Sequence, residues 1–430
     1  MSDRYLGTPA MPPARSTPSG GVAGRLAICL WDFSWYTRAG AGEPYEDVDR
    51  AMADTAALGY HAVRICAAPL LLAGELGLDE IAAELRIEGL GTAPDGLPYG
   101  RGTRWYDVTG GYAIDLRARL HELLDAARRH GMRVILASWE YQQSPAFAAD
   151  RRWFDAIDAV PLAARHDVLA AAWDRLLSEI RGWGLTDVVA FVELHNEVDF
   201  SILPPLAGAG ETALARLRAR HPGTRVTASF GKPPHLAMHA MPGELDVIQA
   251  HVYSYGVLDA LQRRIDIRSE GSEGFPNAAL RDLLRDDAPT PAAYGRPVAW
   301  KLAATVVTDQ MVYGYDWIDP ERWDSWLDAH YEPHHEVMLR EIESRVIAIA
   351  AWAHHCGVPA VIGEGWVGYT PLHGRFEEGR RGLELAEHGI RTALAWGVWG
   401  VVPCSNAAPH HPMWSDAAWQ RRITALVSEA

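Results

Sequence analysis

The sequence predicts an α/β fold, a (β/α)8 barrel with long loops after the second and sixth strands. Short apolar runs alternate with longer amphipathic segments along residues 25–430. The runs are apolar nearly throughout, which is typical of parallel strands buried on both faces. Eight such units close naturally into a barrel. A doubly wound open sheet is the main alternative, but no G-x-G-x-x-G follows the first strand and no G-x-x-x-x-G-K-[ST] is present.

The predicted strands are runs rich in Val, Ile, Leu, Ala and Cys, such as RLAICLW, HAVRICA and RVILASW. In chain order they cover residues 25–31, 61–67, 133–139, 187–194, 225–230, 246–253, 360–363 and 398–403. Each is followed by a segment whose apolar residues recur at helical spacing. These helices are predicted at residues 48–58, 114–130, 163–183, 211–220, 234–241, 336–356, 379–396 and 414–428.

The domain organisation follows from composition and loop length. Residues 1–24 are rich in Pro, Ser, Gly and Ala and have no apolar core, so we expect a flexible arm and no secretory signal. Residues 25–430 are expected to form a single catalytic domain with an insertion at 254–335. This insertion and the loop at 68–113 would both lie at the C-terminal face of a barrel, where active sites are built.

Charge and cysteine usage exclude several classes of function. Lys plus Arg minus Asp plus Glu is 40 − 55 = −15, which would repel a nucleic-acid backbone. No apolar stretch is long enough to span a membrane. The four cysteines form no C-x-x-C pair, and free thiols suit a cytoplasmic protein. The insertion holds many aromatic residues, and those at 300–331 could form a lid or an interface of a homo-oligomer.

Residues just past the strand ends would converge on one pocket. They are acids, aromatics and hydrogen-bonding side chains: Asp32, Arg64, Trp139, Glu140, His195, Asn196, Glu197, His251, Tyr253, Glu364, Trp366 and Trp399. This chemistry is typical of a sugar site, because indoles stack on sugar rings and polar groups bind hydroxyls. Of the 17 Trp, which outnumber the 8 Phe, many could equally fill a large core.

Two glutamates stand out, Glu197 in FVELHNE and Glu364 in VIGEG. They follow the fourth and seventh strands, which lie roughly across a barrel from each other. Retaining glycoside hydrolysis needs two carboxyl groups about 5–5.5 Å apart. Glu193 lies four residues before Glu197 on the same strand, so both point inward, and the deeper Glu193 is expected to pair with Arg64.

Four short motifs carry a family resemblance over about residues 25–425. They are HAVRIC, ELHNE, AHVY and IGEGW. With them the chain resembles the clan-A retaining glycoside hydrolases, closest to the cellulase-like family 5. The resemblance implies that Glu197 is the acid/base, that Glu364 is the nucleophile and that Asn196 binds the sugar 2-hydroxyl. The chain departs from the family at Val198, where Pro is common, and at Trp399, which lies well before the end of the eighth strand.

The resemblance also implies supporting roles. Arg64 and Tyr253 would hydrogen-bond Glu364, and His251 would lie beside Glu197. The residues expected to bind substrate are Asp32, Trp35, Trp139, Glu140, His195, Trp366 and Trp399. The predicted activity is a retaining β-glycosidase that acts on the ends of short oligosaccharides, with β-mannosidase favoured by resemblance and β-glucosidase next.

Two alternatives remain open at this stage. A barrel that binds sugar without turnover would keep the same pocket. A metal-dependent hydrolase is disfavoured, because no H-x-H follows the first strand and HLAMH at residues 235–239 lacks the Glu of H-E-x-x-H. We expect no metal site and no cofactor.

Overall fold

The computed structural model describes residues 24–368 and 371–430. The predicted flexible arm, residues 1–24, lies outside the described residues except for Gly24. Among the residues that are described, no helix has the length and apolar character needed to cross a bilayer.

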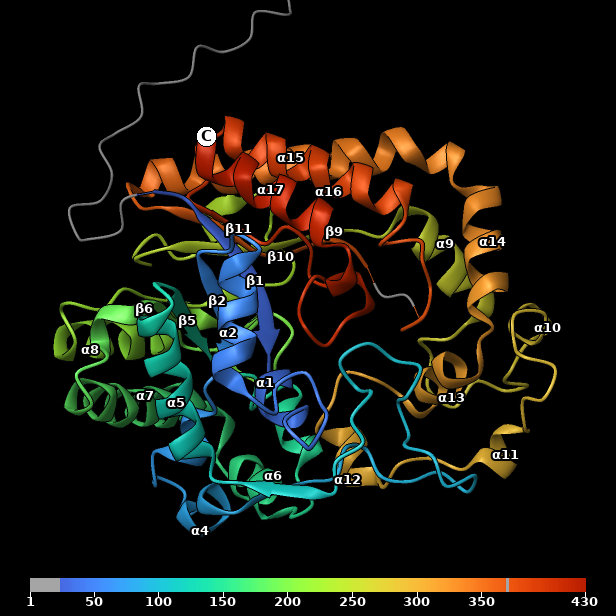
Figure 1. Ribbon diagram of the computed structural model, residues 1–430, viewed down its shortest axis with the longest axis horizontal. Coiled ribbons are helices and arrows are strands. Elements are labelled where there is room, and N and C mark those ends of the chain that lie inside the picture. Colours follow the sequence, from blue (N-terminus) through green and yellow to red (C-terminus); the bar gives the residue numbers. More distant parts are fainter. Residues whose placement is uncertain (1–23, 369–370) are drawn as a thin grey trace, which may run out of the picture.

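The barrel strands form one nine-stranded sheet, and every pairing in it is parallel. Its order is β7-β6-β5-β2-β1-β11-β10-β9-β8 (Figure 1). β7 and β8 are two halves of a single run, Val226–Thr227 and Ser229–Phe230, and they pair with β6 and β9 respectively. The sheet therefore closes on itself through this run, and the predicted (β/α)8 barrel is confirmed.

The remaining barrel strands lie where the apolar runs predict them. They are β1 (Leu26–Asp32), β2 (Ala62–Cys66), β5 (Arg133–Ala137), β6 (Val189–Glu193), β9 (Ile248–Ser254), β10 (Ala360–Val367) and β11 (Gly400–Val401). β10 is longer than predicted because Trp366 and Val367 continue to pair with β9. β11 is shorter than the predicted run 398–403, which ends in Pro403, a residue that cannot donate to a strand ladder.

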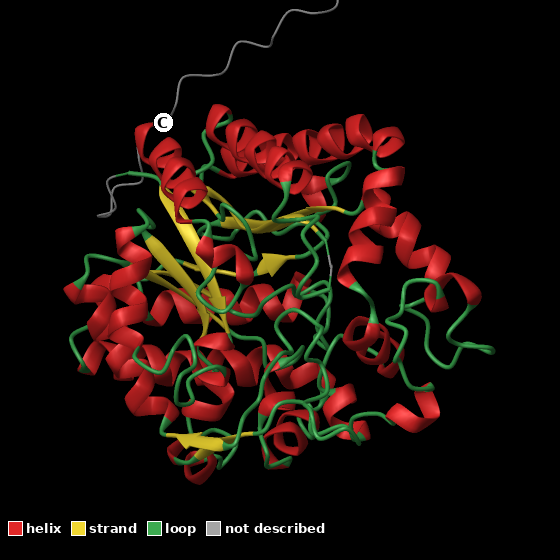
Figure 2. Ribbon diagram, turned by 45° about the vertical axis from the view of Figure 1, so that its right-hand side comes forward, coloured by secondary structure: helices red, strands yellow, loops and turns green. Residues whose placement is uncertain are grey.

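Helices cover the outside of the barrel (Figure 2). The covering helices are α2 (Val48–Ala57), α5 (Leu116–Arg129), α7 (Arg165–Gly182), α8 (Glu211–Arg220), α15 (Glu332–Cys356), α16 (Arg380–Ala395) and α17 (Ala417–Glu429). The helix predicted at 234–241 is wrong, since only a 3-10 turn forms there, at Met238–Ala240. Prolines at 233, 234 and 242 bound this segment, and so short a stretch cannot offset the cost of starting a helix.

The two long loops contain short elements of their own. The loop after β2 contains α3 (Pro69–Leu72), α4 (Asp79–Ala83) and the antiparallel pair β3 (Leu85–Ile87) and β4 (Tyr112–Ile114). The insertion after β9 contains α9 (Gly256–Ile265), α10 (Ala278–Arg281), α11 (Pro291–Tyr294), α12 (Ala299–Ala303), α13 (Asp309–Trp317) and α14 (Pro320–His330).

Asp316 joins the two loops, which lie side by side in cyan and orange in Figure 1. Its carboxylate accepts the backbone N–H groups of Gly100 at 2.8 Å and Gly102 at 2.7 Å, and the Tyr294 hydroxyl at 2.5 Å. A Cβ on Gly102 would lie 2.1 Å from the Tyr315 carbonyl oxygen, so only glycine permits this approach.

The barrel interior changes from apolar to polar toward the C-terminal ends of the strands. At the other end, a small cluster of buried side chains that includes Ile28, Ile135, Phe191 and Val361 fills the barrel. Glu193 lies two residues after Phe191 on β6, so it points inward as well, one layer higher. This arrangement places a buried charged layer directly beneath the pocket at the strand ends.

Candidate active site

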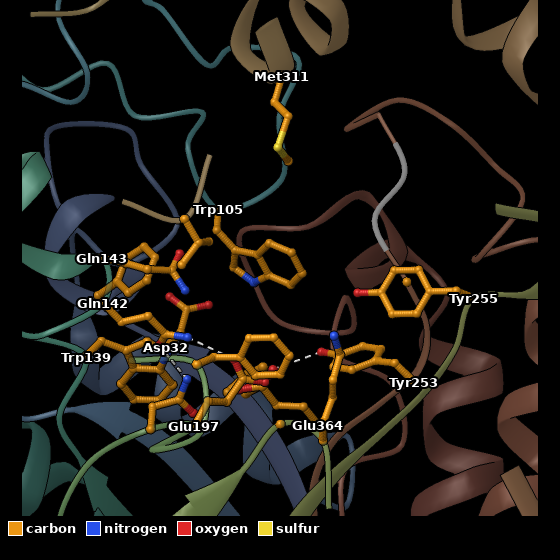
Figure 3. A pocket seen from close by; sticks show the side chains of 18 of the residues that line it. Asp32, Trp105, Trp139, Gln142, Gln143, Glu197, Tyr253, Tyr255, Met311 and Glu364 are labelled. Carbon is orange, nitrogen blue, oxygen red and sulfur yellow. Dashed lines mark hydrogen bonds between the residues drawn. The ribbon is translucent and has the colours of Figure 1, made fainter. Parts of the chain in front are cut away.

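A cavity of about 290 Å³ lies at the C-terminal ends of the strands (Figure 3). Strand ends and both long loops supply its walls. The residues labelled in Figure 3 are Asp32, Trp105, Trp139, Gln142, Gln143, Glu197, Tyr253, Tyr255, Met311 and Glu364. Asn196 also lines it.

The two predicted catalytic carboxyls meet in this cavity. One oxygen of Glu197, one of Glu364 and a ring nitrogen of His251 all lie within 4.8 Å of one another. Glu364 is on β10, and Glu197 follows β6 with a left-handed backbone (φ 43°). The Ser229 hydroxyl accepts the Glu197 N–H at 2.9 Å and helps to hold this uncommon conformation.

Arg64 links the buried layer to Glu364. Its Nη1 donates to Glu364 Oε1 at 2.8 Å, while Nε and Nη2 donate to the two Glu193 oxygens at 2.7 Å each. The predicted pairing of Glu193 with Arg64 is confirmed. Burial lowers the pKa of Arg64, but Glu193 and Glu364 outweigh it, so the pKa is raised and the cation is permanent.

Tyr253 holds the second oxygen of Glu364. The Tyr253 hydroxyl donates to Glu364 Oε2 at 2.9 Å and lies 2.9 Å from the Ser405 hydroxyl. Burial and the charge of Glu364 raise the pKa of Tyr253, so the phenol keeps its proton and acts as a donor. Glu364 thus receives one hydrogen bond on each oxygen from groups that stay protonated.

Glu197 is held by a different pair of partners. His251 Nδ1 lies 2.8 Å from Glu197 Oε1, and Gln142 Nε2 donates to Oε2 at 2.8 Å. Asn196 fixes Gln142 by donating to its amide oxygen at 2.8 Å, and Asn196 in turn accepts from Arg64 at 2.6 Å. A continuous hydrogen-bond network therefore joins both carboxyls.

Glu197, His251 and Glu364 titrate as one coupled group. Burial acts to raise the pKa of Glu197, but His251 and Gln142 outweigh it, so this pKa is lowered. Burial lowers the pKa of His251, but Glu364 and Glu197 outweigh it and the pKa is raised. Burial raises the pKa of Glu364, with Glu197 adding to the rise and His251 and Arg64 opposing it. The proton that Glu197 and His251 share is therefore on the His251 side of their hydrogen bond.

Two predicted sugar-binding residues lie in the cavity. Trp139 lines it and lies under the Arg64 guanidinium, 4.6 Å from its ring centroid. Asp32 is buried, and its Oδ1 accepts the Ser34 N–H at 2.5 Å. Its Oδ2 has no hydrogen-bond partner in the described part of the chain, and the carboxylate points into the cavity in Figure 3.

Two predicted tryptophans lie in the core instead, a correction to the sequence analysis. The Trp35 indole donates to the Cys66 carbonyl at 2.9 Å, away from the cavity. The Trp366 indole donates to the carbonyls of Val402 and Pro403 at 3.2 and 3.1 Å. Both rings are completely buried, so neither can stack on a sugar.

Glu140 and His195 do not line the cavity either, a further correction to the sequence analysis, because their side chains bind backbone N–H groups of neighbouring segments instead. Glu140 accepts the N–H groups of Leu70 and Leu71, both at 2.9 Å. Burial raises the pKa of Glu140 to about 7, because it outweighs these hydrogen bonds, which lower the pKa. His195 accepts the Tyr141 N–H at 3.0 Å, and burial lowers its pKa to about 3. Both are structural residues.

Trp399 lies at the opposite end of the barrel. It precedes β11, and its indole donates to the Gly24 carbonyl at 3.2 Å and lies 6.1 Å from the Phe191 ring. A residue at the start of a strand is at the N-terminal face, so Trp399 cannot reach the site.

Sequence reasoning missed several lining residues. Gln142 comes three residues after Trp139, and the polar pair at 142–143 next to a strand end is a signal that could have found it. Trp105, Tyr255 and Met311 come from the two long loops. The loops could be predicted to border the site, but the sequence gives no indication of which loop residues face inward.

The same three groups are also the described set that could hold a metal ion. Each carboxylate oxygen already accepts from a protein group, namely His251 and Gln142 on Glu197, and Arg64 and Tyr253 on Glu364. A cation would have to displace these donors and lie close to the permanent charge of Arg64. The donor set fits a pair of reacting carboxyls better than a metal site.

Comparison with known families decides the affiliation. A family model described as "Cellulase-like: Sugar-binding cellulase-like" matches residues 28–204 and 211–428. The chain belongs to this cellulase-like family. The resemblance predicted from the sequence motifs is thereby confirmed. The family and the site chemistry support a glycoside hydrolase with a carbohydrate substrate.

Solved structures similar to this cellulase-like protein are distant in sequence. A putative glycoside hydrolase from Parabacteroides distasonis is 20% identical over 94% of each chain, with a TM-score of 0.63, and has the same fold. A glycoside hydrolase family 5 mannosidase from Rhizomucor miehei is 13% identical over 94% of each chain, with a TM-score of 0.46. No curated protein matches.

Proposed function

We propose that this cellulase-like protein is a retaining β-glycosidase that releases sugars from the ends of short oligosaccharides. The observation that carries the proposal is the approach of Glu197 and Glu364 to within 4.8 Å. Retaining enzymes hold their carboxyls about 5–5.5 Å apart, whereas inverting enzymes need about 6.5–9.5 Å to admit a water molecule. The shorter spacing leaves one carboxylate in reach of the anomeric carbon.

The hydrogen bonds of the two carboxyls support a division of roles between them. Arg64 and Tyr253 both donate to Glu364 and stay protonated, so Glu364 is the nucleophile that attacks the anomeric carbon. Glu197 is the acid/base. When the single proton crosses the 2.8 Å bond from His251 Nδ1 to Glu197, His251 becomes neutral and Glu197 becomes the acid while Glu364 stays ionised.

The reaction then runs as a double displacement. Glu364 forms an ester with the sugar as Glu197 protonates the leaving oxygen. Glu197, now ionised, takes a proton from water, and the water oxygen attacks the anomeric carbon and releases Glu364. Asn196 would bind the 2-hydroxyl, as the family resemblance implies, and its hydrogen bonds with Arg64 and Gln142 support this role.

Action on chain ends is supported by the size and enclosure of the cavity. Its volume of about 290 Å³ is at the lower limit of the roughly 300–1,000 Å³ of small-molecule sites. The two loops joined by Asp316 form walls that a long open cleft would lack. Asp32 Oδ2, which lies 3.4 Å from His410 Nε2 but accepts no hydrogen bond within the described residues, would accept a hydroxyl of the terminal sugar. The preference for β-mannosides, then β-glucosides, rests on the family resemblance.

We also propose that residues 25–430 act as one catalytic domain in the cytoplasm. The four cysteines are all free, which suits a reducing compartment. The joined loops make the insertion part of the barrel mouth rather than a separate unit.

The direct test is a panel of aryl β-glycosides followed by trapping with the matching 2-deoxy-2-fluoro sugar. We expect release from at least one glycoside and a mass increase of one fluorosugar on the peptide that contains Glu364. Glu364→Gln should keep the fold, as judged by circular dichroism, and neither turn over nor be labelled. No release from any β-glycoside at any pH would favour a silent sugar-binding barrel, and loss of activity in a chelator would favour a metal-dependent hydrolase.

A further inference from the structure

Two cations line the cavity without a carboxylate partner. The chain has only two lysines, Lys232 and Lys301. Lys301 is buried and pairs with Glu88 at 3.0 Å. Lys232 is exposed at the cavity, where its ammonium lies 4.5 Å from the centroid of the Phe200 ring. No carboxylate of residues 24–368 or 371–430 forms a salt bridge with it.

Arg268 is the second cation. Its Nε donates to the Gln262 side-chain oxygen at 2.7 Å, and its guanidinium lies 5.5 Å from the Tyr255 ring centroid. Both Arg268 and Tyr255 line the cavity. Within the described residues, Arg268 forms no salt bridge either. Arg345 lines the cavity too, but it pairs with Glu341 at 2.5 Å and donates to the Tyr253 carbonyl, so its charge is neutralised.

The backbone fixes Lys232 on the side of Glu197. Asp199 accepts the N–H groups of Gly231 at 2.8 Å and Lys232 at 2.7 Å, so both carboxylate oxygens hold this turn. A Cβ on Gly231 would lie 2.6 Å from Glu197 Oε1, which shows how closely the turn packs on the acid/base carboxyl. Since Glu197 protonates the leaving oxygen, Lys232 borders the space that the leaving group occupies.

Charge then sets the orientation of the substrate. The chain carries a net charge of −15, and Asp32, Glu197 and Glu364 place three carboxyls at the floor of the cavity. An anionic group would be repelled by these three carboxyls and attracted by the unpaired cations Lys232 and Arg268, which line the same cavity. The sugar that enters the floor should therefore be neutral.

We propose that the leaving-group half of the substrate carries an anionic group, a carboxylate or a phosphate, which binds Lys232, with Arg268 as a second positive charge in the same cavity wall. The inference deepens the proposed glycosidase function and rests on it. Unpaired cations with a free approach to a ligand provide charge-assisted hydrogen bonds and favour encounter with an anion.

The test compares leaving groups on the sugar that the wild-type enzyme cleaves. Its substrates are the 4-carboxyphenyl, 4-phosphonophenyl and neutral 4-carbamoylphenyl β-glycosides. We expect a higher kcat/KM for an anionic glycoside than for the neutral one. The ratio of kcat/KM for each anionic glycoside to that for the neutral one is measured, and the larger ratio identifies the preferred anion. Lys232→Met and Arg268→Gln should each lower that ratio about threefold to tenfold, the range of one partly exposed charge contact. Added salt should lower the wild-type ratio as well.

Two control variants isolate the charge at the rim. Lys232→Arg should keep the preference, because it keeps the cation. Arg263→Gln removes an exposed arginine in the last turn of α9, five residues before Arg268, that pairs with Asp259, and should also keep the preference. If all three glycosides are cleaved with the same ratio in wild type and Lys232→Met, the anion site is overturned and the glycosidase stands. If none is cleaved, the proposed function falls and this inference falls with it.

Discussion

At the residue scale, one guanidinium organises the whole site. Arg64 donates to Glu364, Glu193 and Asn196, and it lies over the Trp139 ring. Its charge is balanced by Glu193 below, which leaves Glu364 above available as a nucleophile. The same residue therefore stabilises the barrel interior and orients the reacting carboxylate.

This double role can be separated by mutation. Arg64→Met leaves Glu193 buried without a cation, which should lower the free energy of unfolding by about 3–5 kcal/mol. Adding Glu193→Gln should restore much of that stability in urea denaturation but none of the activity. A single Arg64→Met variant as stable as wild type would contradict the proposed balance of charge.

His251 should control the basic limb of the pH–rate profile. Its cation lowers the pKa of Glu197, so His251→Gln should raise this pKa. A higher pKa keeps Glu197 protonated to higher pH, and the basic limb of kcat/KM should move upward. The profile is best measured with an activated aryl glycoside, for which the loss of rate is smallest. A limb that moves downward would show that His251 acts in another way.

Glu197→Ala distinguishes an acid/base residue from a mere binding residue. A poor leaving group needs protonation and an activated one does not, so the variant should lose far more kcat on the former. Azide should restore part of the rate by replacing water as the attacking nucleophile. Equal losses on both kinds of substrate, measured side by side, would count against the assignment.

At the scale of elements, sequence periodicity predicts strands well and side-chain direction poorly. The eight apolar runs all become barrel strands, and the inward direction of Glu193 follows from the period of two within β6. Just past a strand end, side chains no longer alternate strictly between inward and outward directions. Glu140 and His195, which the sequence predicts in the pocket, therefore turn away from it. Gln142 belongs to such an irregular segment, where only the folded chain shows its contact with Glu197.

The structural role of Glu140 provides a test at this scale. Its carboxylate accepts two N–H groups at the start of α3. Glu140→Gln keeps one acceptor oxygen, so we expect a loss of about 0.5–2 kcal/mol of stability, as for other helix caps. Activity per folded molecule should stay close to wild type. A selective rise in KM without a change in thermal stability would instead restore the predicted role in sugar binding.

At the scale of the whole molecule, two loops far apart in the sequence close the mouth of the barrel. Their lengths indicate a functional role, but the tie at Asp316 between residues 100–102 and Tyr294 could not be predicted, because it depends on a close approach of two backbones. The pocket shape, and with it the preference for chain ends, depends on this tie.

Asp316→Ala should therefore loosen both loops together. Three polar groups lose their shared acceptor, so we expect a higher KM with a smaller change in kcat, and faster proteolysis near residues 95–105. Asp286→Ala, an exposed aspartate of the same insertion that pairs with Arg322, is the matched control and should change neither. Unchanged KM and protease resistance in Asp316→Ala would show that the loops close without this contact.

The central claim is that Glu364 bonds directly to the sugar, because the short spacing between the Glu197 and Glu364 carboxyls brings Glu364 within reach of the anomeric carbon. Proton NMR of the product formed in the first minutes, before mutarotation, reports the stereochemical course. The account predicts that the β-anomer of the released sugar appears first and the α-anomer later. First appearance of the α-anomer would show a single displacement by water and would contradict the claim.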